Sequence, residues 1–230
     1  MKQRIWELDA LRGLCILSVM TFHLIYDLIE VFQVISWDYP AWFIFVRDWG
    51  GVIFLILSGI CVTLGTHHLR RGILVLGAGT VVTLVTWAMT FAGFDSSMII
   101  YFGVLHCLGT CMLLWEPLRR LPQWALALLC VIIIPLGFYF ETLLVSTPWL
   151  VPLGLMFPTF ATADYFPLFP HLGFFLLGAL LGKWLYRNKT TLLPQVNPRY
   201  FTFLCFCGRQ SLWIYLLHQP VLYGICSLIF

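Results

Sequence analysis

The feature that most constrains this chain is a series of long apolar stretches separated by short polar breaks. A helix needs about 20 mostly apolar residues to cross a bilayer. Hydrophobic residues make up 61% of the chain and charged residues 10%, which leaves too little polar surface for a soluble fold. We predict an all-α polytopic membrane bundle, a single domain over residues 1–230, with about seven transmembrane helices: Leu11–Ile35, Ala41–Thr66, Gly72–Gly93, Met98–Glu116, Trp124–Val145, His171–Arg187 and Phe201–Phe230.

The basic residues fall on one side of this predicted topology. Of the 13 Lys and Arg residues, only Arg47 lies on the opposite side. The positive-inside rule makes the basic side cytoplasmic, so we expect a cytoplasmic N-terminus, an outward C-terminus and a multi-pass protein of a bacterial inner membrane. A net charge of +3 then reflects topology and gives no support to nucleic-acid binding. The cytoplasmic set is Lys2, Arg4, Arg12, Arg70, Arg71, Arg119, Arg120, Lys183, Arg187, Lys189, Arg199 and Arg209.

The longest break, residues 146–170, holds five of the 12 prolines and many aromatic residues, but no Lys or Arg. Non-helical backbone at membrane depth persists only when protein covers it or it lines water. We therefore expect this segment to form a lid on the outer face or a partly re-entrant segment.

The first predicted span carries the polar groups that are most suited to chemistry. Ionisable side chains inside a span are costly and usually face the bundle interior or a water-filled cavity. At about 100° per residue, Arg12, His23 and Glu30 fall on nearly the same line, and Asp27 lies one turn beyond His23. One hypothesis makes His23 a general base or acyl relay that Asp27 orients. The alternative is an interhelical hydrogen-bonded pair that only stabilises the bundle.

Three further polar residues are candidate substrate contacts. His106 and His218 count out to near the middle of their spans, and Gln219 with its following proline marks a kink beside His218. Each histidine is alternatively a satisfied buried residue. The eight Cys residues lack the ligand spacing of a zinc site, so we assign no metal.

The arginines allow two interpretations. Arg47 lies on the outer side, where it either binds an anionic substrate or forms a structural ion pair with Asp27, Glu30 or Asp38. Arg70, Arg71 and Arg119 either contact lipid headgroups or, together with Arg12, hold the phosphates of a cofactor.

The segment ELDALRGLCILSVMTFHLIYDL at residues 7–28 resembles the opening of a bacterial membrane family related to heparan-alpha-glucosaminide N-acetyltransferase. Later segments resemble the same family, so the similarity covers nearly the whole chain. The spacing from Arg12 to His23 also matches the transmembrane acyltransferase group, which includes the acyltransferase-3 family. These later segments are GGVIFLILSGI (50–60), IYFGVLHCLG (100–109), FPHLGFFLLGALLGKWL (169–185) and GRQSLWIYLLHQPVL (208–222).

The resemblance implies a cytoplasmic acetyl-CoA donor and transfer of acetyl to a hydroxyl or amine of a sugar-like acceptor. This chain also differs from the family in two respects. The lysosomal enzyme places its proposed catalytic histidine just after the first helix, where this chain reads ISWDYPAWF and has none. The chain is also shorter than its larger relatives, so that part of the acceptor site either comes from a second subunit of a homo-oligomer or is absent. The rival hypotheses are a small-solute or proton-coupled transporter and a noncatalytic accessory protein.

Overall fold

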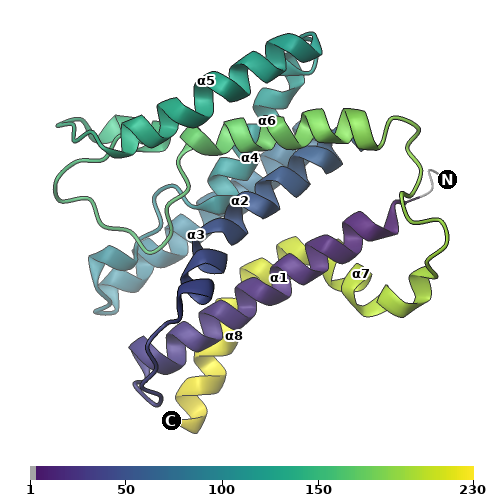
Figure 1. Ribbon diagram of the computed structural model, residues 1–230. Coiled ribbons are helices and arrows are strands. Elements are labelled where there is room, and N and C mark those ends of the chain that lie inside the picture. The colour runs from purple at the N-terminus through teal and green to yellow at the C-terminus, as the bar shows by residue number, and fades with distance from the viewer. Residues whose placement is uncertain (1–3) are drawn as a thin grey trace. The chain divides into compact units, whose positions relative to one another are not determined.

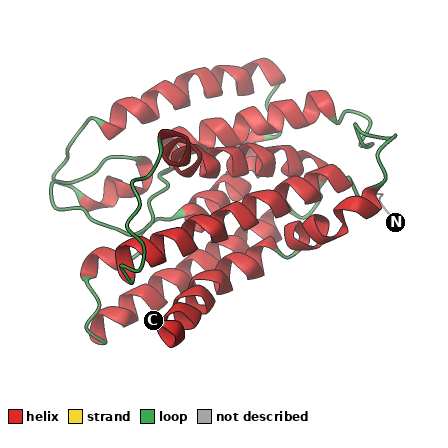
Figure 2. Cartoon of the chain, turned by 60° about the horizontal axis from the view of Figure 1, so that its bottom comes forward, coloured by secondary structure: helices red, strands yellow, loops and turns green. Residues whose placement is uncertain are grey.

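The computed structural model describes residues 4–230, and Lys2 of the predicted cytoplasmic set lies outside them. Within that range the chain consists of helices and loops, with two isolated β-bridges and no strand (Figure 2). The prediction of an all-α membrane bundle is confirmed. The chain divides into two compact units, one built from residues up to Leu57 and from Tyr186 onward, the other from Ser58–Leu185.

Unit 1 combines the two ends of the chain. Its helices α1 and α8 run alongside each other, and the short α7 packs against the first half of α1 (Figure 1). In this packing, backbone meets backbone. A Cβ on Gly13 would collide with the Leu204 carbonyl, and one on Gly208 with the Asp9 carbonyl. The elements are α1 (Trp6–Tyr26), η1 (Asp27–Val31), the first part of α2 (Ala41–Leu64), η4 (Pro198–Phe201), α7 (Thr202–Arg209) and α8 (Ser211–Ile229).

Unit 2 holds the middle of the chain. Its helices pack in the pairs α3 with α4 and α5 with α6, and the end of α2 lies against α6. Glycines again permit the close contacts, because a Cβ on Gly109 would meet the Leu76 backbone and one on Gly59 the Phe175 carbonyl. The elements are α3 (His68–Phe91), η2 (Ser96–Met98), α4 (Val104–Leu118), α5 (Gln123–Glu141), η3 (Pro148–Leu153) and α6 (Leu168–Leu185).

In residues 4–230, six helices are long and apolar enough to cross a membrane, and α4 is a shorter apolar helix. The predicted span Met98–Glu116 starts too early, because Ile99 to Gly103 are non-helical. The Ile100 amide donates to Thr86 Oγ1 at 3.1 Å, and its carbonyl accepts from Thr83 Oγ1 at 2.6 Å. These bonds satisfy the backbone without a helical turn.

The predicted seventh span is wrong as one helix. The segment is two helices, α7 and α8, which separate at Gln210, where φ is −97° and ψ is 11°. The first helix also begins five residues earlier than predicted, at Trp6 instead of Leu11. Its first turn carries Glu7 and Asp9, carboxylates that favour a helix N-terminus.

The proline- and aromatic-rich segment is irregular, as predicted, apart from η3. It is fastened to the rest of unit 2 by side-chain hydrogen bonds. Asp164 Oδ2 accepts from the Val104 amide at 3.0 Å and caps α4, and Thr162 Oγ1 donates to the Ile99 carbonyl at 2.7 Å. Phe169, at the start of α6, is non-helical with φ −104° and ψ 125°, so the regular helix begins close to the predicted end of the segment.

Candidate functional site

Two histidines from opposite ends of the chain meet inside unit 1. His23 on α1 and His218 on α8 have ring centroids 4.8 Å apart with an interplanar angle of 61°. His218 is buried, with 6% of its surface exposed, and His23 is half-buried. The sequence assigned His23 to the first span and His218 to the last without indicating whether these spans touch, and the fold brings the two rings into contact.

The ring of His218 is fixed by the backbone of its own helix. Its Nδ1 lies 2.5 Å from the Tyr215 carbonyl, which can only accept a hydrogen bond, so Nδ1 carries the proton. In the neutral imidazole, Nε2 then has a free lone pair. Within the described chain this Nε2 is buried and without a hydrogen-bond partner. Such a nitrogen can take up a proton from a bound molecule.

Asp27 and Gln219 form the second pair of the cluster. Gln219 Nε2 donates to both carboxylate oxygens of Asp27, at 2.9 and 3.1 Å, while Asp27 is only 1% exposed. His218 lies close enough to Asp27 to interact with it electrostatically. Gln219 Oε1 is buried, and the described residues offer it no partner. The hydrogen bonds of Asp27 therefore come from Gln219, whereas we had expected Asp27 to orient His23.

A change of helical pitch separates Asp27 from Glu30. At Asp27 the α-helix passes into the π-helix η1, in which the Phe32 amide donates to the Asp27 carbonyl at 2.8 Å, five residues back. The wider turn rotates the residues that follow, so Glu30 is exposed and accepts from Tyr39 Oη at 3.3 Å. The prediction that Glu30 lies on the same line as Arg12 and His23 is wrong, because it assumed 100° per residue throughout the helix.

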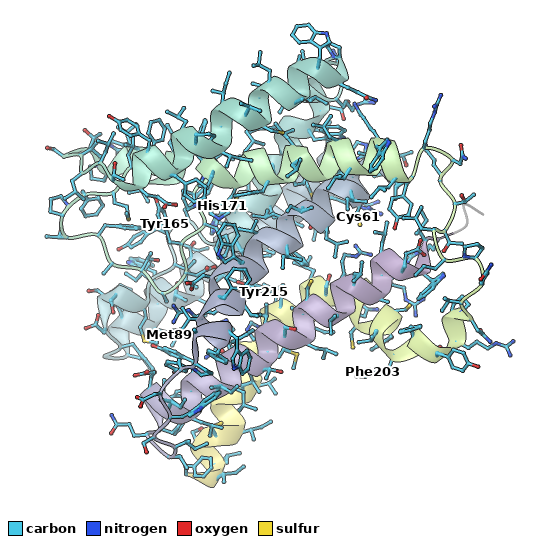
Figure 3. The ribbon with its side chains drawn as sticks, viewed as in Figure 1. Cys61, Met89, Tyr165, His171, Phe203 and Tyr215 are labelled. Atoms are coloured by element: carbon cyan, nitrogen blue, oxygen red, sulfur yellow. The ribbon has the colours of Figure 1, made fainter. Side chains whose placement is uncertain are left out.

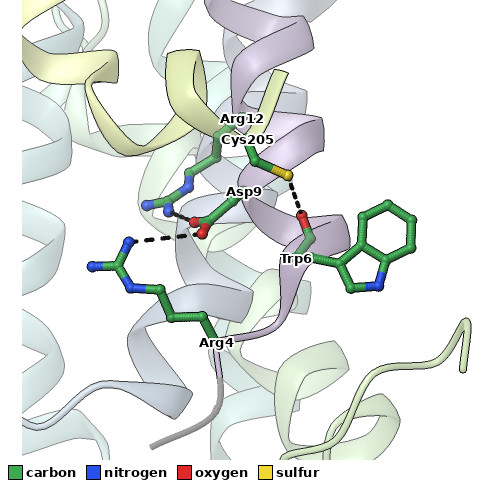
Figure 4. A network of polar contacts seen from close by, with 5 residues as sticks. All are labelled: Arg4, Trp6, Asp9, Arg12 and Cys205. Carbon is green, nitrogen blue, oxygen red and sulfur yellow. Dashed lines mark hydrogen bonds and ion pairs between the residues drawn. The ribbon is translucent and has the colours of Figure 1, made fainter. Parts of the chain in front are cut away.

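Three arginines of unit 1, Arg4, Arg12 and Arg47, lie beside carboxylates. Arg12 is hydrogen-bonded to Asp9, one turn earlier on α1, and Arg4 Nη1 lies 3.8 Å from the second oxygen of the same carboxylate (Figure 4). Arg47 pairs with its neighbour Asp48 at 2.8 Å, and both side chains are about half exposed. The partners that we had considered for Arg47 were wrong.

Unit 2 has histidines of its own. His106 Nε2 lies 3.3 Å from Thr83 Oγ1, and its ring packs 5.6 Å from that of Phe102. His171, which the sequence analysis did not single out, places Nδ1 2.7 Å from the Pro167 carbonyl (Figure 3). Both rings are buried and have local partners.

The three predicted phosphate-binding arginines of unit 2 lie at its surface. Arg119 bonds Glu116 Oε1 at 2.5 Å, and this hydrogen bond raises the pKa of Arg119. Arg70 and Arg71 are exposed. Their exposed side chains are compatible with both interpretations, contact with lipid headgroups and binding of cofactor phosphates.

Several contributors escaped the sequence analysis. Tyr215 acts through its carbonyl, which any residue type would supply. Glu7 is buried and accepts from Thr191 Oγ1 at 2.9 Å and from the Leu192 amide at 2.8 Å, which holds the loop before α7. The only hint in the sequence was an acidic residue at the entrance of a hydrophobic helix.

Comparison with known proteins defines the family. The family model described as heparan-alpha-glucosaminide N-acetyltransferase, catalytic, matches residues 4–220. No curated protein and no solved structure matches the chain at a significant level. The matched range includes the cluster of His23, Asp27, His218 and Gln219. The chain is a multi-pass membrane protein that belongs to the heparan-alpha-glucosaminide N-acetyltransferase catalytic-domain family, a family of acetyltransferases.

Proposed function

We propose that this protein transfers an acetyl group from cytoplasmic acetyl-CoA to a hydroxyl or amine of a sugar-like or cell-envelope acceptor. The reaction centre is the cluster of His23, Asp27, His218 and Gln219. The observation that carries the proposal is the buried, unpartnered Nε2 of His218, whose other nitrogen is held by Tyr215. Membership of an acetyltransferase family supports the reaction class.

The residues of the cluster divide the work of acyl transfer. The bound thioester supplies the electrophilic carbonyl carbon and the thiolate that leaves. His218 Nε2 takes the proton from the acceptor hydroxyl or amine as that oxygen or nitrogen bonds to the carbonyl carbon and the carbon–sulfur bond breaks. His218 then returns the proton to the departing thiolate. Asp27 stabilises the positive charge that His218 carries between these two steps.

His23 and Gln219 position the reactants. His23 is in edge contact with His218 and serves either as a second base or as an acyl relay, in which its own nitrogen accepts the acetyl group before the acceptor does. The free Oε1 of Gln219 can accept a hydrogen bond from the acceptor hydroxyl or amine. The role of Gln219 uses an oxygen that has no hydrogen-bond partner among the described residues.

The remaining candidate residues have peripheral roles in the proposal. Arg12, Arg70, Arg71 and Arg119 attract the anionic donor to the cytoplasmic surface. Arg47 on the outer side contacts the acceptor. These assignments follow from the predicted topology and the charge of the side chains.

The proposed setting is a bacterial cytoplasmic membrane with the N-terminus on the cytoplasmic side. The protein works in contact with the lipid bilayer and takes a small, glycan-like molecule as its acceptor. A homo-oligomer would let a second copy contribute to the acceptor site. Nucleic acid has no place in this scheme.

The test is acetyl transfer by purified full-length protein in nanodiscs with radiolabelled acetyl-CoA and an amino-sugar acceptor. We expect His218→Ala to lower the transfer rate by about 10²- to 10⁴-fold, the usual range for a general base. His23→Ala should also lower it. His67→Ala, which alters an exposed histidine, is the matched control and should leave the rate unchanged. Full transfer by His218→Ala would refute its role as the base.

Transport is the alternative that the same preparation can examine. If the chain carried a solute or protons across the membrane, proteoliposomes would show flux that does not depend on acetyl-CoA. Flux of this kind, combined with no transfer of label by the wild-type protein, would overturn the enzymatic proposal. An accessory role predicts that alanine at His23, His106 and His218 leaves the cellular phenotype intact.

A further inference from the structure

A basic pocket lies at the N-terminal end of α1, within unit 1 and apart from the histidine cluster. It encloses about 210 Å³ and brings together the start of α1, η4 and α7. Four of its lining residues are charged, namely Arg4, Arg199, Arg209 and Asp9. The others are Trp6, Pro198, Thr202 and Cys205. Figure 4 shows four of these lining residues, Arg4, Trp6, Asp9 and Cys205, in their network of polar contacts with Arg12.

The charges of the pocket do not cancel. Three arginines and one aspartate line the pocket, and the carboxylate of that aspartate is already hydrogen-bonded to Arg12, which does not line the pocket. Arg4 makes only a long ion pair with Asp9, at 3.8 Å, and its side chain is 69% exposed. The lining therefore keeps an excess of positive charge and several guanidinium N–H donors for an anion.

The N-terminus of α1 adds to the positive electrostatic potential of the pocket. The first residues of α1 carry backbone N–H groups, and the residue that precedes them, Ile5, caps none of these groups with its side chain. The N-terminus of a helix attracts anions. The carboxylates of its first turn are engaged elsewhere, since Glu7 is bonded to Thr191 and Leu192, and Asp9 to Arg12.

We infer that this pocket binds phosphate-ester groups, and that its ligand is the phosphate-bearing end of the acyl donor. The identity of the ligand rests on the proposed function. Guanidinium groups match the geometry of phosphate oxygens and bind them with two parallel hydrogen bonds. The same chemistry would also recognise the headgroup of an anionic phospholipid, so the experiment must separate the two sources.

The size and the place of the pocket suit this assignment. A volume of 210 Å³ is smaller than the roughly 300–1,000 Å³ of sites that enclose a whole drug-sized ligand, and it matches one end of a long molecule. From Asp9 at the pocket to His23, α1 advances by 14 residues, or about 21 Å at 1.5 Å per residue. An extended pantetheine arm spans a distance of this kind between phosphates and thioester.

The experiment measures binding of CoA to full-length protein in nanodiscs of neutral phosphatidylcholine. We expect Arg199→Gln and Arg209→Gln each to weaken binding by about tenfold, which corresponds to about 1.4 kcal/mol. Lysine at the same positions should restore part of the affinity, because the charge remains while the two-pronged hydrogen bonding is lost. Arg187→Gln is the matched control, since this arginine is exposed and lies outside the pocket. Thermal stability of each variant reports whether it is folded.

A second arm repeats the binding in nanodiscs that contain phosphatidylglycerol. If CoA and the lipid headgroup occupy the same phosphate site, phosphatidylglycerol should weaken CoA binding to the wild type. The same lipid should change CoA binding less in the Arg199 and Arg209 variants. Equal CoA affinity in folded variants and wild type would overturn the pocket assignment while leaving wild-type acetyl transfer, and with it the proposed function, intact. If wild type bound no CoA and phosphatidylglycerol alone stabilised it through these arginines, the donor assignment would fall together with the proposed function.

Discussion

Replacing Gln219 by leucine should expose how much the cluster depends on the Asp27–Gln219 contact. The change removes two hydrogen bonds to a carboxylate that is 1% exposed. Hydrogen bonds to charged groups contribute about 1.5–3 kcal/mol each in water-soluble proteins. Interhelical polar pairs in membranes average about 0.6 and reach about 1.7 kcal/mol, because the unfolded chain also finds partners in the bilayer. For two bonds to one buried carboxylate we expect a coupling of about 1–2 kcal/mol, near the upper end of the membrane range.

The assay is a double-mutant cycle on the free energy of unfolding, measured in mixed micelles for wild type, Asp27→Leu, Gln219→Leu and the double variant. Gln219→Leu alone should be the least stable, since it leaves a buried carboxylate without a partner. The double variant should recover most of that loss, because it removes both polar groups. Asp27→Asn, which still accepts a hydrogen bond, serves as the conservative control. A coupling below about 0.3 kcal/mol would mean that the pair contributes no net stability and would refute this reasoning.

Three further results are expected. Gly208→Ala should lower the free energy of unfolding by about 1–3 kcal/mol, because the added Cβ would meet the backbone of α1. Gly224→Ala, where a Cβ would have nothing within 4 Å, should be neutral or stabilise α8 by about 0.5–1 kcal/mol. Thermal unfolding of the two variants measures the difference. Burial raises the pKa of the Cys205 thiol, so only a small fraction of it is thiolate at pH 7. In a variant that keeps only this cysteine, the rate of maleimide labelling should therefore rise about tenfold per pH unit up to the pKa. A labelling rate independent of pH would contradict this expectation. Glu7→Ala should speed hydrogen exchange at residues 191–193, which lose their anchor, and unchanged exchange there would show that the anchor is dispensable.

Hydropathy was sufficient to predict the architecture, because lipid imposes one length and one composition on every spanning segment. It was weaker where a helix is interrupted without losing its apolar character. No proline lies at the break at Gln210 between α7 and α8, since the nearest prolines are Pro198 and Pro220. The close approach of Gly208 to the Asp9 carbonyl accompanies this break, and it is a tertiary contact that composition does not encode.

Periodicity was similarly informative up to one point on the first helix. An α-helical count placed His23 and Asp27 one turn apart, which agrees with both joining one cluster. It failed at Glu30, because the π-helical turn after Asp27 inserts an extra residue into the repeat. Without that turn Glu30 would stay on the line of His23, about 10 Å further along the helix axis. The deviation in backbone geometry therefore directs Glu30 away from the face of the helix that carries His23.

The two tasks usually assigned to one carboxylate are divided in this cluster. In a catalytic triad an acidic side chain both selects the histidine tautomer and stabilises the imidazolium. Here the Tyr215 carbonyl selects the tautomer of His218, and it lies on the same helix, only three residues away. Asp27, held by Gln219, is left to supply negative charge without touching Nδ1. The orientation of the His218 ring thus depends on the integrity of α8 alone, whereas the electrostatic effect of Asp27 on that ring depends on the packing of α1 against α8. Substitutions can therefore alter the ring orientation and the electrostatic effect separately.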